Sequence, residues 1–185
     1  MAVTVQGPMR RTNWQSPSGG ERQPSPAPED LPSRQVSSDN WTHWQALIQE
    51  IPFVVPEAVV PDLYATTPAE AFRVLLGALV DAGVIPEAKQ DTALAGLLRR
   101  EELASKGIGH GVAIPHTKHS SVTQVRAAVG YSRSGIDFRS LDERPVHLIL
   151  LIISPPHNPG EHLRALQNIA SLLRRQQEST EPNPA

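Results

Sequence analysis

The chain has 185 residues with 17 basic and 19 acidic side chains, so its formal net charge is −2 at pH 7. This balance gives no basic surface of the kind that binds nucleic acid or an anionic membrane. The absence of cysteine excludes a disulfide framework and a thiolate metal site. The N-terminus lacks the apolar core of a signal peptide, and the longest apolar run, residues 148–153, is far too short to cross a bilayer. We therefore expect a cytoplasmic protein with no membrane insertion and no nucleic-acid partner.

The N-terminal segment is rich in Pro, Ser, Gln, Gly and charged side chains. Such a segment cannot bury enough apolar surface to offset the entropy of ordering it, so we predict a disordered leader over residues 1–40. Residues 41–51 follow as a short amphipathic helix, with Asn40 as its N-cap and with Trp41 and Trp44 on its apolar face. This helix either packs on the folded domain or docks on a partner protein.

The folded body is predicted over residues 52–175. It opens with apolar runs that prolines interrupt, and a clear helix follows. Thr67 is the N-cap of this helix, Pro68 takes the first helical position and Gly83 ends it, which is the usual placement of these residue types. A second helix is predicted over residues 86–103, because leucines recur there at helical spacing.

Two strands and a helix complete the body. Residues 122–134 read as a strand, and the apolar run 145–154 is typical of a strand buried on both faces. Asn158 then caps a helix that starts at Pro159, and the polar residues 176–185 are predicted to fray. The order of these elements predicts an α/β domain in which helices flank a small mixed sheet.

Three histidines, His110, His116 and His119, lie close together in the stretch SKGIGHGVAIPHTKH. They could be metal ligands, a catalytic cluster or solvated loop residues. A zinc site needs three or four convergent ligands, and neither a carboxylate nor a common zinc spacing accompanies these side chains, so metal binding is disfavoured. The stretch contains no phosphate-binding loop of the G-x-x-x-x-G-K-[ST] type and no dinucleotide fingerprint, so nucleotide binding is not expected.

His116 follows a short apolar run, Val112 to Ile114, that Pro115 can end as a strand. A histidine at a strand end, in a loop opened by glycines, is held rigidly and still reaches solvent. Neutral imidazole is a good nucleophile near physiological pH, so His116 is a candidate acceptor of a transferable group. The alternative is an ordinary loop histidine.

His162 lies in the first turn of the last helix, where free N–H groups and the helix dipole favour an anion and a neutral imidazole. It could donate a hydrogen bond to an anionic group, or it could point at water. Arg99 and Arg100 end the apolar stripe of the second helix. Either both are solvated beside Glu101 and Glu102, or one guanidinium turns inward to grip a phosphoryl group.

The stretch LLRREELASKGIGHGVAIPHTKH resembles the enzyme IIA domain of the bacterial phosphoenolpyruvate-dependent sugar phosphotransferase system, of the fructose/mannitol type that includes a nitrogen-regulatory branch. That family carries a pattern close to RE-x-x-x-x-x-GIG-x-G-(V/I)-AIPH, which the sequence matches without a gap from Arg100 to His116. Two later stretches, GIDFRSLDERPVHLILLIISP and GEHLRALQNIASLL, resemble the family's strand–turn–strand segment and a helix that begins near a second histidine. The resemblance covers residues 55–175 and implies a mannitol-type enzyme IIA fold.

The resemblance implies a role for each matching residue. His116 would accept a phosphoryl group from the phosphocarrier protein HPr, or a relative of it, and pass the group on. His162 would be the second active-site histidine, in contact with the phosphoryl group, and Arg100 would help to neutralise its charge. Three glycines would let the backbone come close to the phosphoryl group: Gly107, Gly109 and Gly111. We expect no cofactor and no metal.

No sugar-binding, membrane or IIB-like segment is visible in the sequence, which favours a regulatory, nitrogen-type member of the family over a component of sugar transport. Its partners would be an HPr-like donor and either an enzyme IIB-like acceptor or regulatory target proteins. Lys106 and His110 depart from the family pattern, and the family's chains continue past the last helix, whereas this sequence stops at Ala185. The alternative is therefore a degenerate interaction module that keeps the enzyme IIA fold and transfers no phosphoryl group.

Overall fold

The computed structural model describes residues 39–103, 107–140 and 142–180. All of them belong to the second of the chain's two units, residues 36–185. The predicted leader therefore lies outside the described residues except for its last two positions, and Lys106 lies outside them as well.

Helices and strands are interspersed along the described part of the chain. In order they are α1 (Asp39–Gln49), β1 (Val54–Val60), α2 (Pro68–Asp81), the 3₁₀ turn η1 (Glu87–Lys89), α3 (Gln90–Leu103), β2 (Gly107–Gly109), β3 (Val112–Ala113), β4 (His116–Lys118), β5 (Arg126–Ile136), β6 (Val146–Ser154) and α4 (Pro159–Thr180). α1 coincides with most of the segment in which the short amphipathic helix is expected. α4 continues into the segment that is expected to fray.

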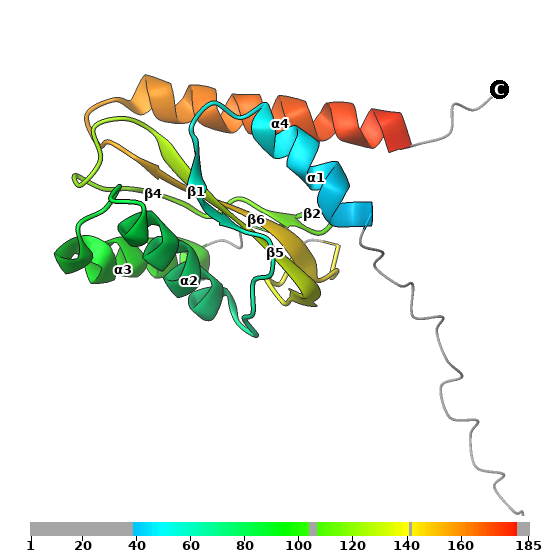
Figure 1. Cartoon of the computed structure of the whole chain (residues 1–185), viewed down its shortest axis with the longest axis horizontal. Coiled ribbons are helices and arrows are strands. Elements are labelled where there is room, and N and C mark those ends of the chain that lie inside the picture. The colour runs from blue at the N-terminus through cyan, green and yellow to red at the C-terminus, as the bar shows by residue number, and fades with distance from the viewer. Residues whose placement is uncertain (1–38, 104–106, 141, 181–185) are drawn as a thin grey trace, which may run out of the picture. The chain divides into compact units, whose positions relative to one another are not determined.

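One mixed sheet runs through the middle of this unit (Figure 1). Its strands are ordered β1-β5-β6-β3-β2, and β4 pairs with β6 beyond the end of β3. β1 is parallel to β5, β3 and β4 are parallel to β6, and the β5–β6 and β2–β3 pairs are antiparallel. The predicted fold class, a small mixed sheet flanked by helices, is confirmed.

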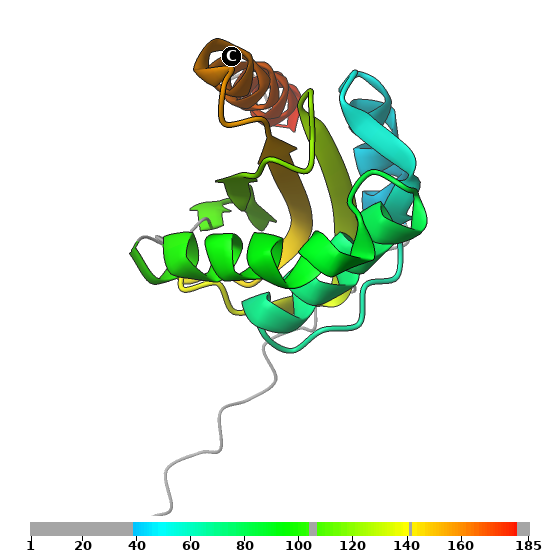
Figure 2. The ribbon, with the colours of Figure 1, turned by 90° about the vertical axis from the view of Figure 1, so that its left-hand side faces the viewer.

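Helices cover both faces of the sheet. α2 and α3 lie on one side, and α1 and α4 lie on the other (Figure 1 and Figure 2). Side chains of β6 alternate between the two layers, as successive residues of a strand do. Ile149 and Ile153 pack in the cluster that includes α2 and α3, whereas Leu148 and Ile152 pack in the cluster that includes α1 and α4. β6 is thus buried on both faces, which explains its uninterrupted apolar sequence.

The starts of α2 and α4 follow the capping pattern that the sequence predicts. The backbone N–H of Glu70 donates to Thr67 Oγ1 (3.3 Å), and that of Glu161 donates to Asn158 Oδ1 (3.2 Å). Each helix begins with a proline, at a position where no backbone N–H is needed. Because α4 begins at a defined residue, the position of the His162 side chain in its first turn is fixed.

Two elements differ from the sequence-based expectation. The apolar runs around Pro56 form a single strand, β1, because β1 is an edge strand and an edge strand tolerates proline. His116–Lys118 form the short strand β4, although His116 was expected in a loop, because β6 extends far enough to pair with them. The second difference matters for the site, since it fixes the face of the sheet toward which His116 points.

Candidate functional site

Strand β4 carries His116 at its first position. Its pairing with β6 sets His116 beside Ile152, a residue of the cluster that includes α1 and α4. Successive strand residues point to opposite faces, so His116 and Lys118 face the α4 layer and Thr117 faces α3. Thr117 packs closely there, because a Cβ added to Gly96 of α3 would lie 2.7 Å from Thr117 Oγ1.

Two contacts fix the tautomer of His116. Nδ1 lies 2.9 Å from the carbonyl oxygen of Ile114, and Nε2 lies 3.1 Å from Nη2 of Arg100. A carbonyl can only accept a hydrogen bond, and a guanidinium can only donate one. In this arrangement His116 is neutral, with its proton on Nδ1 and its lone pair on Nε2. Nε2, which carries this lone pair, is the nucleophilic atom of the ring, and the guanidinium of Arg100 lies beside it.

His162 supplies a second imidazole. Its ring centroid lies 5.2 Å from that of His116, and the two rings are tilted by 52°. Nδ1 of His162 lies 2.8 Å from Oγ of Ser154, the last residue of β6. Burial lowers the pKa of His162 below its ordinary value, and electrostatic interactions with His116, Lys118 and Arg100 lower it further. The three residues that the sequence singled out for chemistry, His116, His162 and Arg100, are therefore brought together.

The glycine-rich segment makes a tight turn between β2 and β3. Gly109 and Gly111 have φ of +88° and +74°, and His110 between them has φ of +55°. This left-handed backbone favours glycine, which accounts for two of the glycines in the motif. Asp142 holds the turn, because its Oδ2 accepts the N–H of His110 (2.8 Å).

Gly107, the first glycine of the motif, opens β2 and is buried. A Cβ at this position would overlap Oγ of Ser140, so this glycine is needed for close packing. The predicted phosphoryl loop therefore divides into two parts. Gly109 and Gly111 shape the turn that leads into β3, and Gly107 lets β2 approach the segment that contains Ser140.

His119, just after β4, belongs to a different network. Its Nε2 donates to Thr92 Oγ1 (2.9 Å), whose own proton goes to the carbonyl of Lys89 (2.8 Å). Its Nδ1 accepts the backbone N–H of Ser121 (3.2 Å). Burial and the charge of Lys89 lower the pKa of His119. This histidine ties the end of β4 to the start of α3, which is a structural role.

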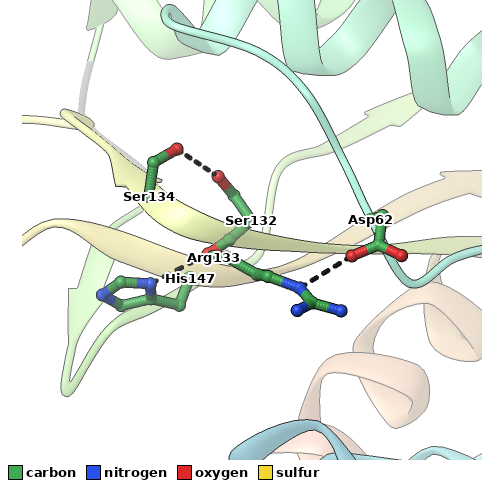
Figure 3. A network of polar contacts seen from close by, with 5 residues as sticks. All are labelled: Asp62, Ser132, Arg133, Ser134 and His147. Carbon is green, nitrogen blue, oxygen red and sulfur yellow. Dashed lines mark hydrogen bonds and ion pairs between the residues drawn. The ribbon is translucent and has the colours of Figure 1, made fainter. Parts of the chain in front are cut away.

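A further histidine, His147, lies near the opposite end of β6 in a separate polar network (Figure 3). Its Nδ1 donates to the carbonyl of Ser132 on β5 (2.9 Å), and Oγ of Ser132 lies 3.3 Å from Oγ of Ser134. In the same view, Arg133 and Asp62 form an exposed ion pair at 2.8 Å. These contacts link β5 to β6 and to the segment after β1, so they stabilise the sheet away from His116.

Two residues of the site were not found from the sequence. Lys118 lies on the same face of β4 as His116, and its charge lowers the pKa of His162. Strand alternation identifies Lys118 once His116 is placed in a strand. Ser154 has no sequence signal, because it meets His162 only after the chain has left β6, turned and entered α4.

Two further properties concern the described residues alone. Within them, no group of three or more His, Asp or Glu side chains is arranged to hold a metal ion. No helix in this part of the chain is both long enough and apolar enough to span a membrane.

Comparisons with known proteins bear on the same part of the chain. The family model described as "Phosphoenolpyruvate-dependent sugar phosphotransferase system, EIIA 2" matches residues 53–181. A nitrogen regulatory protein of Bradyrhizobium diazoefficiens is 34% identical over 123 residues, which are 66% of this chain and 78% of that protein. A fructose-specific EIIABC component of the phosphotransferase system of Bacillus subtilis is 42% identical over 81 residues, which are 44% of this chain and 13% of that protein. The chain therefore spans only a small part of this second relative.

Solved structures share the fold. The nitrogen regulatory protein IIA-Ntr from Neisseria meningitidis superposes with a TM-score of 0.60 at 29% identity, over 75% of this chain and 93% of that chain. Enzyme IIA mannitol of Escherichia coli, solved in complex with phosphorylated enzyme IIB mannitol, gives a TM-score of 0.54 at 20% identity, over 65% of this chain and 81% of that chain. The second likeness concerns the fold alone.

Proposed function

The chain belongs to the EIIA 2 family of the phosphoenolpyruvate-dependent sugar phosphotransferase system, and from this membership we propose that it carries a phosphoryl group on Nε2 of His116. The family supports a phosphocarrier or regulatory role. The observation that carries the choice of atom is the pair of contacts on His116, with Nδ1 tied to the carbonyl of Ile114 and Nε2 facing Arg100. A ring held in this way offers one lone pair, and it offers that lone pair beside a cation.

Transfer to His116 would be a displacement at phosphorus. The lone pair of Nε2 attacks the phosphorus atom of a phosphohistidine on the donor and forms a new N–P bond. The donor's N–P bond breaks, and its electron pair returns to the donor's imidazole. The ring of His116 gains positive charge as the bond forms, and the carbonyl of Ile114 stabilises that charge by accepting Nδ1–H.

The arriving phosphoryl group is negatively charged, so the site must neutralise it. Arg100 would exchange its contact with Nε2 for a contact with a phosphoryl oxygen, which a guanidinium binds well. Lys118 lies on the same face of β4 and would add a second cation. His162 would donate an N–H from its half-buried ring. Positioning and charge stabilisation are most of what phosphoryl transfer requires, so a site of this size suffices.

The proposed partners follow from the same family. The donor would be an HPr-like phosphocarrier protein. The acceptor would be an enzyme IIB-like protein, as in the E. coli complex of enzyme IIA mannitol with phosphorylated enzyme IIB, or a regulatory target protein. We favour the regulatory, nitrogen-type role, because a nitrogen regulatory protein aligns over 78% of its own length. We place the protein in the cytoplasm, because the carrier relay begins with phosphoenolpyruvate.

The test is to incubate the chain with phosphoenolpyruvate, enzyme I and HPr and to measure acid-labile phosphate. The wild-type chain should take up one phosphate, His116→Ala should take up none, and His119→Ala should keep the label because His119 belongs to a separate network. No label on the wild-type chain would favour the interaction-module alternative. As much label on His116→Ala as on the wild-type chain would show that another residue is the acceptor.

A further inference from the structure

Ser154 presents a hydroxyl to the second histidine from a rigid strand end. The residue is buried, with 0% of its surface exposed. Its Oγ lies 2.8 Å from Nδ1 of His162 and 3.4 Å from the carbonyl oxygen of Thr117, to which it can donate. Its backbone is held as well, because it pairs with Lys118 in β4 and its carbonyl accepts the N–H of His119 (2.9 Å).

The contact with Ser154 decides which nitrogen of His162 is available. Nδ1 is engaged by the hydroxyl, and Nε2 has no hydrogen-bond partner within the described residues. The two ring centroids lie 5.2 Å apart, and since the hydroxyl engages Nδ1, Nε2 is the nitrogen left to meet a group carried by His116. Without the hydroxyl, the ring could turn over and present a carbon atom in place of Nε2.

A hydroxyl also suits both charge states of His162. A serine Oγ has one proton and two lone pairs. It can donate to Nδ1 when that nitrogen is bare, and it can accept Nδ1–H when its own proton goes to the carbonyl of Thr117. A doubly protonated imidazole has only N–H donors, so it requires the second arrangement.

We propose that Ser154 is a positioning residue of the phosphoryl site: it keeps Nε2 of His162 turned toward the group on His116, and it accepts Nδ1–H when His162 takes a proton from solvent. The second half of this inference rests on the proposed function, because the negative charge of a phosphoryl group on His116 is what would draw the proton to His162. An N–H donor at Nε2 then faces the phosphoryl oxygens, and Ser154 satisfies the other side of the ring.

The neighbours from β4 and α3 do not help His162 to hold a proton. His116 and Lys118 from β4 and Arg100 from α3 all lower the pKa of His162, after burial, which is the largest cause. None of these side chains places an acceptor on Nδ1. The unphosphorylated site therefore disfavours protonation of His162. The negative charge of a phosphoryl group on His116 must outweigh this effect.

The neighbouring carboxylate on α4, that of Glu161, accepts hydrogen bonds from other groups. Oε1 of Glu161 accepts the N–H of Val125 (3.3 Å), and Oε2 accepts from the side chain of Asn158 (3.0 Å). The acceptor that touches the imidazole of His162 is thus the hydroxyl of Ser154.

The test is an NMR titration of the imidazole nitrogens of His162 in the unphosphorylated full chain. Ser154→Ala removes the hydroxyl, Ser154→Cys keeps a group of similar size that is only a weak acceptor, and Ser154→Thr retains a hydroxyl. Because the acceptor for Nδ1–H is lost, the pKa of His162 should fall below the wild-type value in the Ala and Cys variants. It should return toward that value in the Thr variant. The amide spectrum of each variant reports whether the fold is intact.

A second readout is the rate of phosphoryl transfer. The Ala and Cys variants should transfer about tenfold more slowly, which corresponds to the loss of one hydrogen bond to a charged group, and the Thr variant should recover. A titration that is the same in wild-type, Ala and Cys chains would overturn the proposal. A wild-type chain that takes up no phosphate, combined with a shifted titration, would contradict the proposed function and leave the contact between Ser154 and His162 standing, because the titration is measured without phosphate.

Discussion

Nη2 of Arg100 lies 3.1 Å from Nε2 of His116, so the cation of the site contacts the atom that would form the bond to phosphorus. The contact joins the last turn of α3 to the first residue of β4. In the proposed transfer, this guanidinium would exchange its contact with Nε2 for a contact with the oxygens of the phosphoryl group.

Replacing Arg100 by Gln should slow phosphorylation of the chain by about 10- to 100-fold, because a hydrogen bond to a charged group contributes about 1.5–3 kcal/mol. Arg99→Gln is the matched control. Arg99 is the exposed neighbour of Arg100, so this substitution removes the same charge from the same helix end. The measurement is the initial rate of labelling from phosphorylated HPr. Equal rates for the two variants would show that net charge, and not the contact with His116, is what matters.

The packing of β4 on α3 should be sensitive to one methyl group. Gly96→Ala would place a Cβ 2.7 Å from Oγ1 of Thr117, which is buried and β-branched, so we expect a loss of about 1–3 kcal/mol in the free energy of unfolding. Gly77→Ala is the control, because the nearest atom to its new Cβ, Nε2 of Gln90, is 3.8 Å away. That variant should be neutral or more stable by about 0.5–1 kcal/mol. Urea unfolding measures the free energy of unfolding of both variants. A Gly96→Ala chain as stable as the wild type would contradict the close packing of Gly96 on Thr117.

His119 should make stability depend on pH. Burial and Lys89 lower its pKa in the folded chain below the unfolded value of 6.5, so between the two values the unfolded chain binds more protons. The free energy of unfolding is therefore highest above the unfolded pKa, and it falls as the pH drops through that value toward the folded pKa. A proton on Nδ1 also breaks the bond that this atom accepts from the N–H of Ser121.

The measurement is urea unfolding of the wild-type chain and of His119→Gln at several pH values from 8 to about 5.5. Glu70 and Asp142 titrate below this range, because their pKa values are lowered from 4.5 and 3.8. His162 has a lowered pKa as well, so the variant should lose part of the pH dependence and not all of it. The same slope in both proteins would contradict the assignment of His119 as a half-buried neutral acceptor.

The turn before β3 should depend on Asp142. Asp142→Ala removes the acceptor for the N–H of His110, so this amide should exchange its hydrogen faster and phosphorylation should slow as the turn loosens. Asp142→Asn keeps one side-chain oxygen and should fall between the wild-type and Ala chains. Hydrogen exchange followed by NMR tests this expectation, which fails if the His110 amide is equally protected in all three proteins.

The fold could be read from the sequence wherever local chemistry decides it. Thr67 and Asn158, each followed by a proline, mark the starts of α2 and α4, and the apolar run of β6 marks the centre of the sheet. β4 could not be read in this way. His116–Lys118 carry no strand pattern of their own, and they form a strand because the end of β6 pairs with them.

The site was harder to predict from the residues alone. Sequence chemistry left His116 and Arg100 with both a functional and an ordinary interpretation, and the resemblance to the enzyme IIA family favoured the functional one. The contact between Arg100 and His116 depends on how α3 packs against β4, which no local pattern specifies. Ser154 could not be found because a buried serine at a strand end looks the same whether or not a histidine lies above it.

The central claim is that Nε2 of His116 accepts the phosphoryl group. The most direct measurement is an NMR spectrum that correlates the imidazole protons and nitrogens of the ¹⁵N-labelled chain after phosphorylation by HPr. The contacts of His116 with Ile114 and Arg100 predict a phosphorus-bonded nitrogen at Nε2 of His116 and a retained proton at Nδ1. Phosphate on Nδ1 of His116, or on any other histidine, would contradict the claim.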